Sequence, residues 1–208
     1  MRIKVSRFIL VVMGVIAVNM ALIISVSGVD TARKKDQEFS SITLKEGDLV
    51  FRNGYGMISS WFQRCSLRDP SFSHAGIVVF KEDQPFVVHL QQSNYGSPLK
   101  CERISEFWSK EICSKGAVYR PDVSALEIDN IVEDVKNDLK NIPEFDYEFN
   151  MEDNSKFYCS EWIRDKFINA TGDVNYFPVT SLENFSYIAP DNLYLNQHST
   201  FIYRFNYP

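Results

Sequence analysis

Residues 74–90 have the sequence HAGIVVFKEDQPFVVHL. Its two ends, His74–Phe80 and Phe86–Leu90, are runs of β-branched and aromatic residues, and the polar segment Lys81–Pro85 separates them. Two such runs around a polar loop predict an antiparallel β-hairpin. One histidine stands at the start of the first predicted strand, and a second lies near the end of the other strand.

The register of this hairpin decides whether its two histidines meet. Opposed residues of an antiparallel pair share a face of the sheet, and a slip of one residue reverses the face. Pairing Phe80 with Phe86 would put His74 and His89 on opposite faces. Pairing Lys81 with Phe86 would put both rings on one face. The sequence leaves both registers open.

Outside the hairpin the chain is predicted to form short strands and two clear helices. Apolar runs between turn residues predict strands at 49–51, 117–120 and 200–205, and a short helix near 58–65. A capping-box pattern at Ser124–Glu127 begins a run of helical apolar spacing that Pro143 ends. A second helix is expected to begin near Cys159 and to stop before Gly172. We therefore expect an α+β domain in which an antiparallel sheet packs against the helix that carries Cys159.

The length and composition are typical of one folded domain with an acidic surface. The chain has 208 residues, of which 45% are hydrophobic and 24% charged, and its net charge is −5. This is enough apolar surface for a core, and the negative charge matches nucleic acid poorly, so we expect no nucleic-acid partner. The pattern does not indicate an oligomeric state.

The first 29 residues are predicted to be a signal anchor or a signal peptide. Residues 8–26 contain no charged residue and follow three basic residues. A helix of this length measures about 28 Å, close to the hydrocarbon thickness of a bilayer, which favours an anchor that is retained. The basic residues would stay in the cytoplasm, so a linker at 30–43 and the domain at 44–208 would lie outside it.

The cysteines and histidines show no metal-ligand spacing, so we expect neither a metal nor an organic cofactor. No C-x-x-C pair and no H-E-x-x-H motif is present. Cys101 and Cys113 would form a disulfide in an oxidising compartment if their geometry allowed it, but buried free thiols are an equally good interpretation.

One set of residues could perform nucleophilic catalysis. A thiol in the first turn of a helix lies near backbone N–H groups and the positive end of the helix dipole, which favour the thiolate, and Cys159 is predicted to occupy such a position. His74 is the candidate that would take the thiol proton and later protonate a leaving group. His89, in the adjacent strand, would hold the ring of His74 in the useful tautomer.

Five short segments follow one another along the chain: GDLVF (47–51), SHAGIVV (73–79), FVVHL (86–90), FDYEF (145–149) and FYCSEWI (157–163). Their order resembles the YiiX/YebB-like branch of the NlpC/P60 cysteine hydrolases, circularly permuted papain-like proteins in which the histidine strand precedes the cysteine helix. The resemblance implies a permuted papain-like fold, with Cys159 as nucleophile and His74 as general base and acid. The third, polar position falls on His89, where many YiiX-like members are expected to have Glu.

Three further residues are weaker candidates for supporting roles. The Tyr158 hydroxyl would stabilise an oxyanion, or the residue would simply pack. Asp48 would hydrogen-bond the loop before His74, or close a turn. Gln91 would replace His89 if the register shifted.

These observations predict a Cys-His or Cys-His-His thiol hydrolase that cleaves an amide or ester through a thioester. The resemblance implies that its substrate is a cell-wall peptide or an acyl-lipid or acyl-amide. Several aromatic residues would suit an acyl chain if they framed a cleft, although core packing is their commoner role: Trp61, Phe62, Phe72, Tyr95 and Trp108. The alternatives are a catalytically silent binding or scaffolding module of the envelope and a structural zinc protein.

Overall fold

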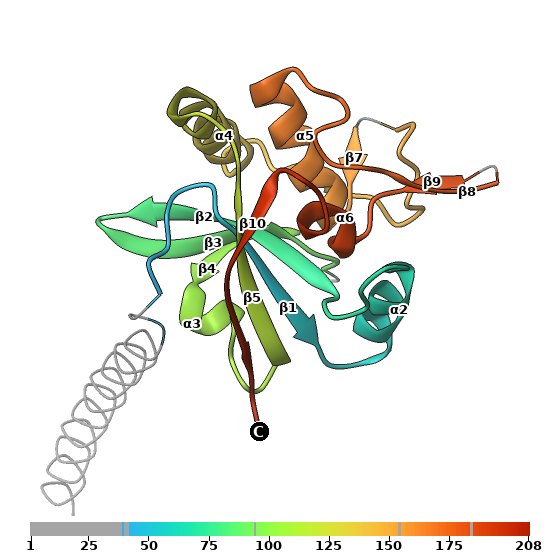
Figure 1. Cartoon of the computed structure of the whole chain (residues 1–208), viewed down its shortest axis with the longest axis horizontal. Helices are drawn as coiled ribbons and strands as arrows, with labels where there is room; N and C mark the ends of the chain where they lie inside the picture. The colour runs from blue at the N-terminus through green and yellow to red at the C-terminus, as the bar shows by residue number, and fades with distance from the viewer. Residues whose placement is uncertain (1–38, 40–41, 94, 154, 184) are drawn as a thin grey trace, which may run out of the picture. The chain divides into compact units, whose positions relative to one another are not determined.

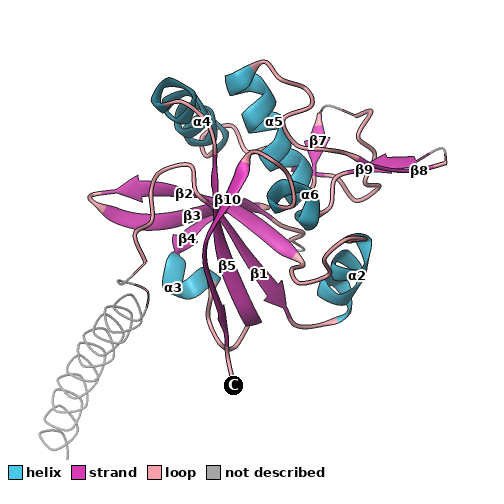
Figure 2. Ribbon diagram, viewed as in Figure 1, coloured by secondary structure: helices cyan, strands magenta, loops and turns pink. Residues whose placement is uncertain are grey.

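A six-stranded antiparallel sheet organises the domain in the computed structural model (Figures 1 and 2). The strands lie in the order β10-β5-β1-β2-β3-β4. Their bounds are β1 Leu49–Gly54, β2 His74–Lys81, β3 Gln84–Leu90, β4 Leu99–Arg103, β5 Cys113–Pro121 and β10 Ser199–Asn206. The structure describes residue 39 and residues 42–93, 95–153, 155–183 and 185–208.

Five helices and two small sheets complete the described part of the chain. The helices are α2 Met57–Cys65, α3 Ile104–Phe107, α4 Ala125–Asp138, α5 Cys159–Thr171 and α6 Pro190–Tyr194. β6 Glu144–Phe145 pairs in parallel with β7 Lys156–Phe157, and β8 Thr180–Leu182 pairs antiparallel with β9 Phe185–Tyr187.

The predicted membrane segment at 8–26 and most of the predicted linker lie outside the described residues. Within the described ranges, no helix combines the length and the apolar character that crossing a bilayer requires.

The two long helices begin where their sequence signals predict, and one of them ends early. Ser124 caps α4, because its side chain accepts a hydrogen bond from the backbone N–H of Glu127 while the Glu127 carboxylate binds the Ser124 backbone. α4 ends at Asp138, before the predicted stop at Pro143, so Ile142 lies beyond the helix and is exposed. α5 begins at Cys159 and ends where Gly172 adopts a left-handed φ of 72°.

The β2–β3 hairpin is tighter than the sequence pattern indicated. Lys81 lies opposite Gln84, so only Glu82 and Asp83 form the turn, and both have positive φ angles, 49° and 59°. Positive φ at both central residues is typical of the type I′ turn, whose twist fits an antiparallel hairpin. Neither register considered from the sequence is found, because Phe86 lies opposite Val79. This register differs by two residues from the one that puts both rings on one face, and a slip of two preserves the face.

The two faces of the sheet have different partners. On one face, Ala75 and Ile77 of β2 belong to the main core, together with Ile131 of α4 and Trp162 of α5. Since side chains alternate along a strand, His74 lies on the other face. Figure 1 shows α4 and α5 on one side of the sheet and α3 on the other. The face of the sheet that carries His74 is thus covered by the segment that contains β4 and α3. The sequence pattern predicted neither of these two elements.

Candidate active site

Cys159 is the first residue of α5, as predicted, and is 3% exposed. Burial raises the pKa of its thiol, and several hydrogen-bond donors oppose this shift: the Ser160 hydroxyl and the backbone N–H groups of Ala75, Ser160 and Cys159 itself. The Ser160 Oγ lies 3.8 Å from the sulfur. The donors surround the position where a thiolate charge would develop, whereas the resting thiol is neutral.

The sulfur lies near the point where β2 and β3 part. The ladder between them ends at the Ile77–Val88 pair, although β2 extends back to His74 and β3 continues to Leu90. The N–H of Ala75 is among the donors near Cys159 Sγ, so the sulfur lies beside the start of β2. Cys159 and His74 line one cavity of about 370 Å³ together with residues from α2 and the ends of β1 and β3. No hydrogen bond joins Cys159 Sγ to the ring of His74, and such contacts are often long without substrate.

The two histidines of the hairpin are in direct contact. His74 Nε2 lies 2.8 Å from His89 Nδ1, with the rings nearly perpendicular at 85°. Gly76 makes room for this arrangement, because a Cβ at that position would lie 2.5 Å from Val87 Cγ1 and 3.1 Å from His89 Cβ. The two rings therefore share one face, an arrangement that the sequence had left open, and they do so through a register that was not considered.

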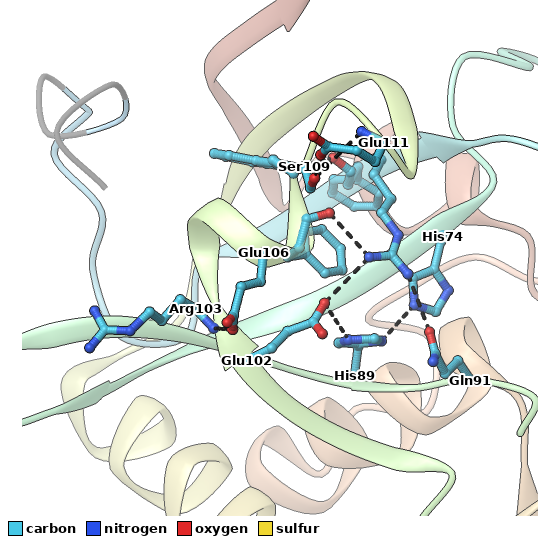
Figure 3. A network of polar contacts seen from close by, with 12 residues as sticks. His74, His89, Gln91, Glu102, Arg103, Glu106, Ser109 and Glu111 are labelled. Atoms are coloured by element: carbon cyan, nitrogen blue, oxygen red, sulfur yellow. Dashed lines mark hydrogen bonds and ion pairs between the residues drawn. The ribbon is translucent and has the colours of Figure 1, made fainter. Parts of the chain in front are cut away.

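A carboxylate continues this chain of contacts. His89 Nε2 lies 3.1 Å from Glu102 Oε1, and Figure 3 shows the three side chains in line: His74, His89 and Glu102. Glu102 belongs to β4, opposite Val87 of β3. The sequence analysis did not identify Glu102, because β4 was not predicted and no local spacing connects Glu102 with the histidines.

Arg52 is the second residue that the sequence analysis missed. Its guanidinium donates hydrogen bonds to Glu102 Oε1 at 3.4 Å, to the Phe107 carbonyl at 3.1 Å and to Gln91 Oε1 at 3.2 Å. It also lies 4.4 Å from the centre of the Phe107 ring. Arg52 lies directly opposite His74 in the β1–β2 pair. A sequence prediction could have placed Arg52 near the site only by predicting this register correctly.

The surroundings keep both imidazoles neutral and the carboxylate charged at neutral pH. Burial, followed by the charges of Arg52 and His89, holds the pKa of His74 well below its ordinary value. Burial also lowers the pKa of His89, and the hydrogen bond to Glu102 opposes that shift. For Glu102, burial raises the pKa, but the hydrogen bond from His89 and the charges of His89 and Arg52 outweigh it and leave the pKa below its ordinary value.

The three supporting candidates have different positions. Tyr158 accepts a hydrogen bond from the Ile188 backbone at 2.8 Å and is a packing residue in the wall of a second cavity, whereas Cys159 lines the first. Asp48 closes a turn with Lys45 and forms an ion pair with Arg120. Gln91 does line the Cys159 cavity, but its side chain contacts Arg52 instead of replacing His89.

The remaining cysteines are thiols without a disulfide. Cys101 lies in β4 and Cys113 begins β5, and both are free, so the disulfide that the sequence left open is not formed. Among the described residues, no cluster of three or more His, Cys, Asp or Glu side chains is placed to hold a metal ion.

Comparisons with known proteins agree with this architecture. The crystal structure described as metalloprotein yiiX from Escherichia coli O157:H7, DUF1105, superposes with a TM-score of 0.63 at 17% identity. The match covers 78% of this chain and 98% of that one, and it shows a common fold. No curated protein matches the sequence. Residues 43–203 match the model of a family described as permuted papain-like amidase enzyme, YaeF/YiiX, C92 family. The chain therefore belongs to the YaeF/YiiX family of permuted papain-like amidases.

Proposed function

We propose that this family member is a thiol hydrolase in which Cys159 and His74 cleave an amide or ester bond. The thiol proton moves to His74 Nδ1 as the sulfur bonds to the substrate carbonyl carbon, and the oxyanion forms near the N-terminal N–H groups of α5. The imidazolium then protonates the leaving nitrogen or oxygen as its bond to carbon breaks. Water, deprotonated by the same ring, attacks the thioester and releases the acid and the thiol.

One observation carries the proposal: Cys159 and His74 line the same cavity, and the His74 ring is fixed through Nε2. The Nε2 contact with His89 leaves Nδ1 as the nitrogen available to the thiol. Helix N–H groups near the sulfur supply the electrostatic stabilisation that acyl transfer requires.

The neutral resting pair favours a second candidate, a catalytically silent envelope module. Burial raises the pKa of Cys159, and burial and Arg52 lower that of His74, so both shifts oppose a preformed thiolate–imidazolium pair. In the hydrolase, proton transfer therefore accompanies attack on the substrate. In a silent module, transfer does not occur, and His74 has no effect on the thiol.

A second cavity supports an acyl-lipid or acyl-amide substrate over a cell-wall peptide. It measures about 500 Å³, and its walls are mainly apolar. Phe62 lines both cavities, so an acyl chain in the second cavity would have a short path to Cys159. Of the five aromatics considered from the sequence, Trp61 and Phe62 line this cavity, whereas Phe72 and Trp108 are fully buried.

We propose further that residues 8–26 tether the enzyme to the cytoplasmic membrane, with residues 30–208 outside the cytoplasm. The uncharged segment and the basic residues before it support this orientation. A lipid-like substrate would be reached from that position.

The test is alkylation of the full chain, in detergent, by iodoacetamide, with each cysteine peptide quantified by mass spectrometry. His74→Ala is expected to slow labelling of Cys159 at neutral pH at least about 10-fold, because the general base contributes about 100-fold or more in such sites. His198→Ala, a matched histidine outside both cavities, is expected to have no effect. Equal Cys159 labelling in all three proteins would establish the silent module.

A further inference from the structure

The third position of the site holds an imidazole, and an imidazole supports a neighbouring imidazolium less well than a carboxylate does. In this chain a carboxylate lies one contact further away. Glu102 Oε1 accepts two hydrogen bonds, one from His89 Nε2 at 3.1 Å and one from Arg52 Nη1 at 3.4 Å. The side chains of His74, His89, Glu102 and Arg52 are thus linked in a row, and the sequence analysis identified the first two of them.

The donor and acceptor rules fix where the protons lie along this chain. An ionised carboxylate only accepts hydrogen bonds, so the contact between Glu102 and His89 requires a proton on His89 Nε2. Neutral His89 then has an acceptor at Nδ1. The 2.8 Å contact between the rings consequently requires a proton on His74 Nε2. The lone pair of neutral His74 is left on Nδ1, where it can accept the thiol proton of Cys159.

Arg52 holds the carboxylate in this role. Its side chain is 12% exposed and is anchored by the Phe107 carbonyl, by Gln91 and by the face of the Phe107 ring. Because Arg52 and His89 share Oε1 of Glu102, rotation of the carboxylate away from His89 would break both contacts. The charge of Arg52 opposes protonation of His74, and Glu102 offsets that charge.

We propose that Glu102, held by Arg52, is a positioning residue that fixes the tautomers of His89 and His74 so that His74 Nδ1 is the base facing the thiol. This inference rests on the proposed function. It adds a carboxylate that acts on His74 through His89.

The direct test is ¹⁵N NMR of the full chain with ¹⁵N-labelled histidine. The chain has three histidines, so three pairs of ring nitrogens are observed and His198 is an internal reference. At neutral pH, His74 and His89 are both expected in the Nε2–H form. Finding the proton of His74 on Nδ1 in the unmodified protein would overturn the inference without any variant.

Two variants separate the acceptor from its charge. Glu102→Leu removes the acceptor, and His89 is expected to become a mixture of tautomers, with Cys159 alkylation slowed at least about 10-fold because His74 is no longer held in one tautomer. Glu102→Gln retains a carbonyl oxygen for both donors, so the tautomers are expected to persist, with a smaller loss of rate.

Glu106→Gln is the matched control. Glu106 is also a carboxylate of the β4–α3 segment, but it accepts a hydrogen bond from the Arg103 backbone at 2.9 Å, and no contact joins it to either histidine (Figure 3). It is expected to change neither tautomer nor alkylation rate. Glu102→Leu spectra and rates equal to those of Glu106→Gln would refute the inference, whereas a rate unaffected by His74→Ala would refute the proposed function itself.

Discussion

Two arginine–carboxylate pairs link separate segments of the same sheet, and they differ in whether the arginine binds both carboxylate oxygens or only one. Asp48, 1% exposed, accepts hydrogen bonds from Arg120 at 2.7 and 2.8 Å and from the Lys45 backbone at 2.7 Å. Glu102, 28% exposed, shares one oxygen between Arg52 at 3.4 Å and His89 at 3.1 Å. The first pair is short, bidentate and confined to structural partners, whereas the second is longer and leads to the histidines.

The comparison teaches that a buried charge can serve the fold or serve a proton-transfer site, and that the partners of the carboxylate distinguish the two. The bidentate pair uses both oxygens of Asp48, and the further hydrogen bond to this carboxylate comes from the Lys45 backbone of the adjoining turn. The Glu102 pair instead links a cation, an imidazole and a cavity. Three experiments sharpen the contrast, and they are given in decreasing order of expected effect.

Asp48→Ala should have the largest effect on stability. It leaves the Arg120 guanidinium and the Lys45 N–H without their acceptor, and since Arg120 is partly exposed the free energy of unfolding is expected to fall by about 3 kcal/mol, the low end for a broken buried pair. Urea unfolding measures this loss, and Glu102→Leu should lose less, because Arg52 keeps the Phe107 carbonyl and Gln91 as hydrogen-bond acceptors. Alkylation of Cys159 per folded molecule should stay unchanged in Asp48→Ala. Equal destabilisation by the two variants would remove the distinction between the pairs.

Gly76→Ala should disturb the Glu102 pair and leave the Asp48 pair intact. The added methyl would lie 2.5 Å from Val87 Cγ1 and 3.1 Å from His89 Cβ, so β3 must shift, at a cost of about 1–3 kcal/mol typical of overpacking. The shift should separate the His74 and His89 rings, and Cys159 alkylation should slow together with the loss of stability. Gly172→Ala, which adds strain at a left-handed helix end with no atom within 4 Å, is the matched control for stability alone. If Gly76→Ala keeps the native histidine ¹⁵N shifts, the claim that Gly76 makes room for the contact between the His74 and His89 rings is wrong.

The pH dependence of stability should come from the titration of His74, which lies beside the Glu102 pair. The folded-state pKa of His74 lies well below that of the unfolded chain, so the unfolded state binds more protons as pH falls through the ordinary histidine range. Stability is then complete above an unfolded pKa of about 6.5 and declines as pH falls below it. His74→Gln should flatten this decline in chemical denaturation at pH 7.5 and 5.5. An unchanged slope would show that the ring titrates normally in the folded protein.

The sequence predicted the parts of the site that depend on local signals. The capping box of α4 and the glycine that ends α5 are short-range patterns, and each located one end of its helix. The sequence also placed Cys159 near the start of a helix. Alternation alone left the shared face of His74 and His89 open, because the face depends on the hairpin register. The two-residue turn at Glu82–Asp83, which sets that register, was not predicted, because neither residue is a glycine or asparagine.

The parts that escaped prediction are held by long-range pairing. Glu102 reaches His89 through the β3–β4 register, and Arg52 reaches Glu102 across the neighbouring strands, so neither contact leaves a periodic trace in the chain. The packing role of Tyr158 depends in the same way on a contact with Ile188, thirty residues away. Local sequence therefore indicated the candidate nucleophile and base, whereas the contacts that join His89, Glu102 and Arg52 were found only in the assembled sheet.

The central claim is most directly tested by trapping the thioester. An activated acyl ester, mixed with the full chain and quenched in acid, should add one acyl group, and peptide mapping should locate it on Cys159 in the unmodified protein and in His198→Ala. His74→Ala should form little of this adduct. Acylation of Cys159 that proceeds equally without His74, or an adduct found only on Cys65 or Cys101, would contradict the account.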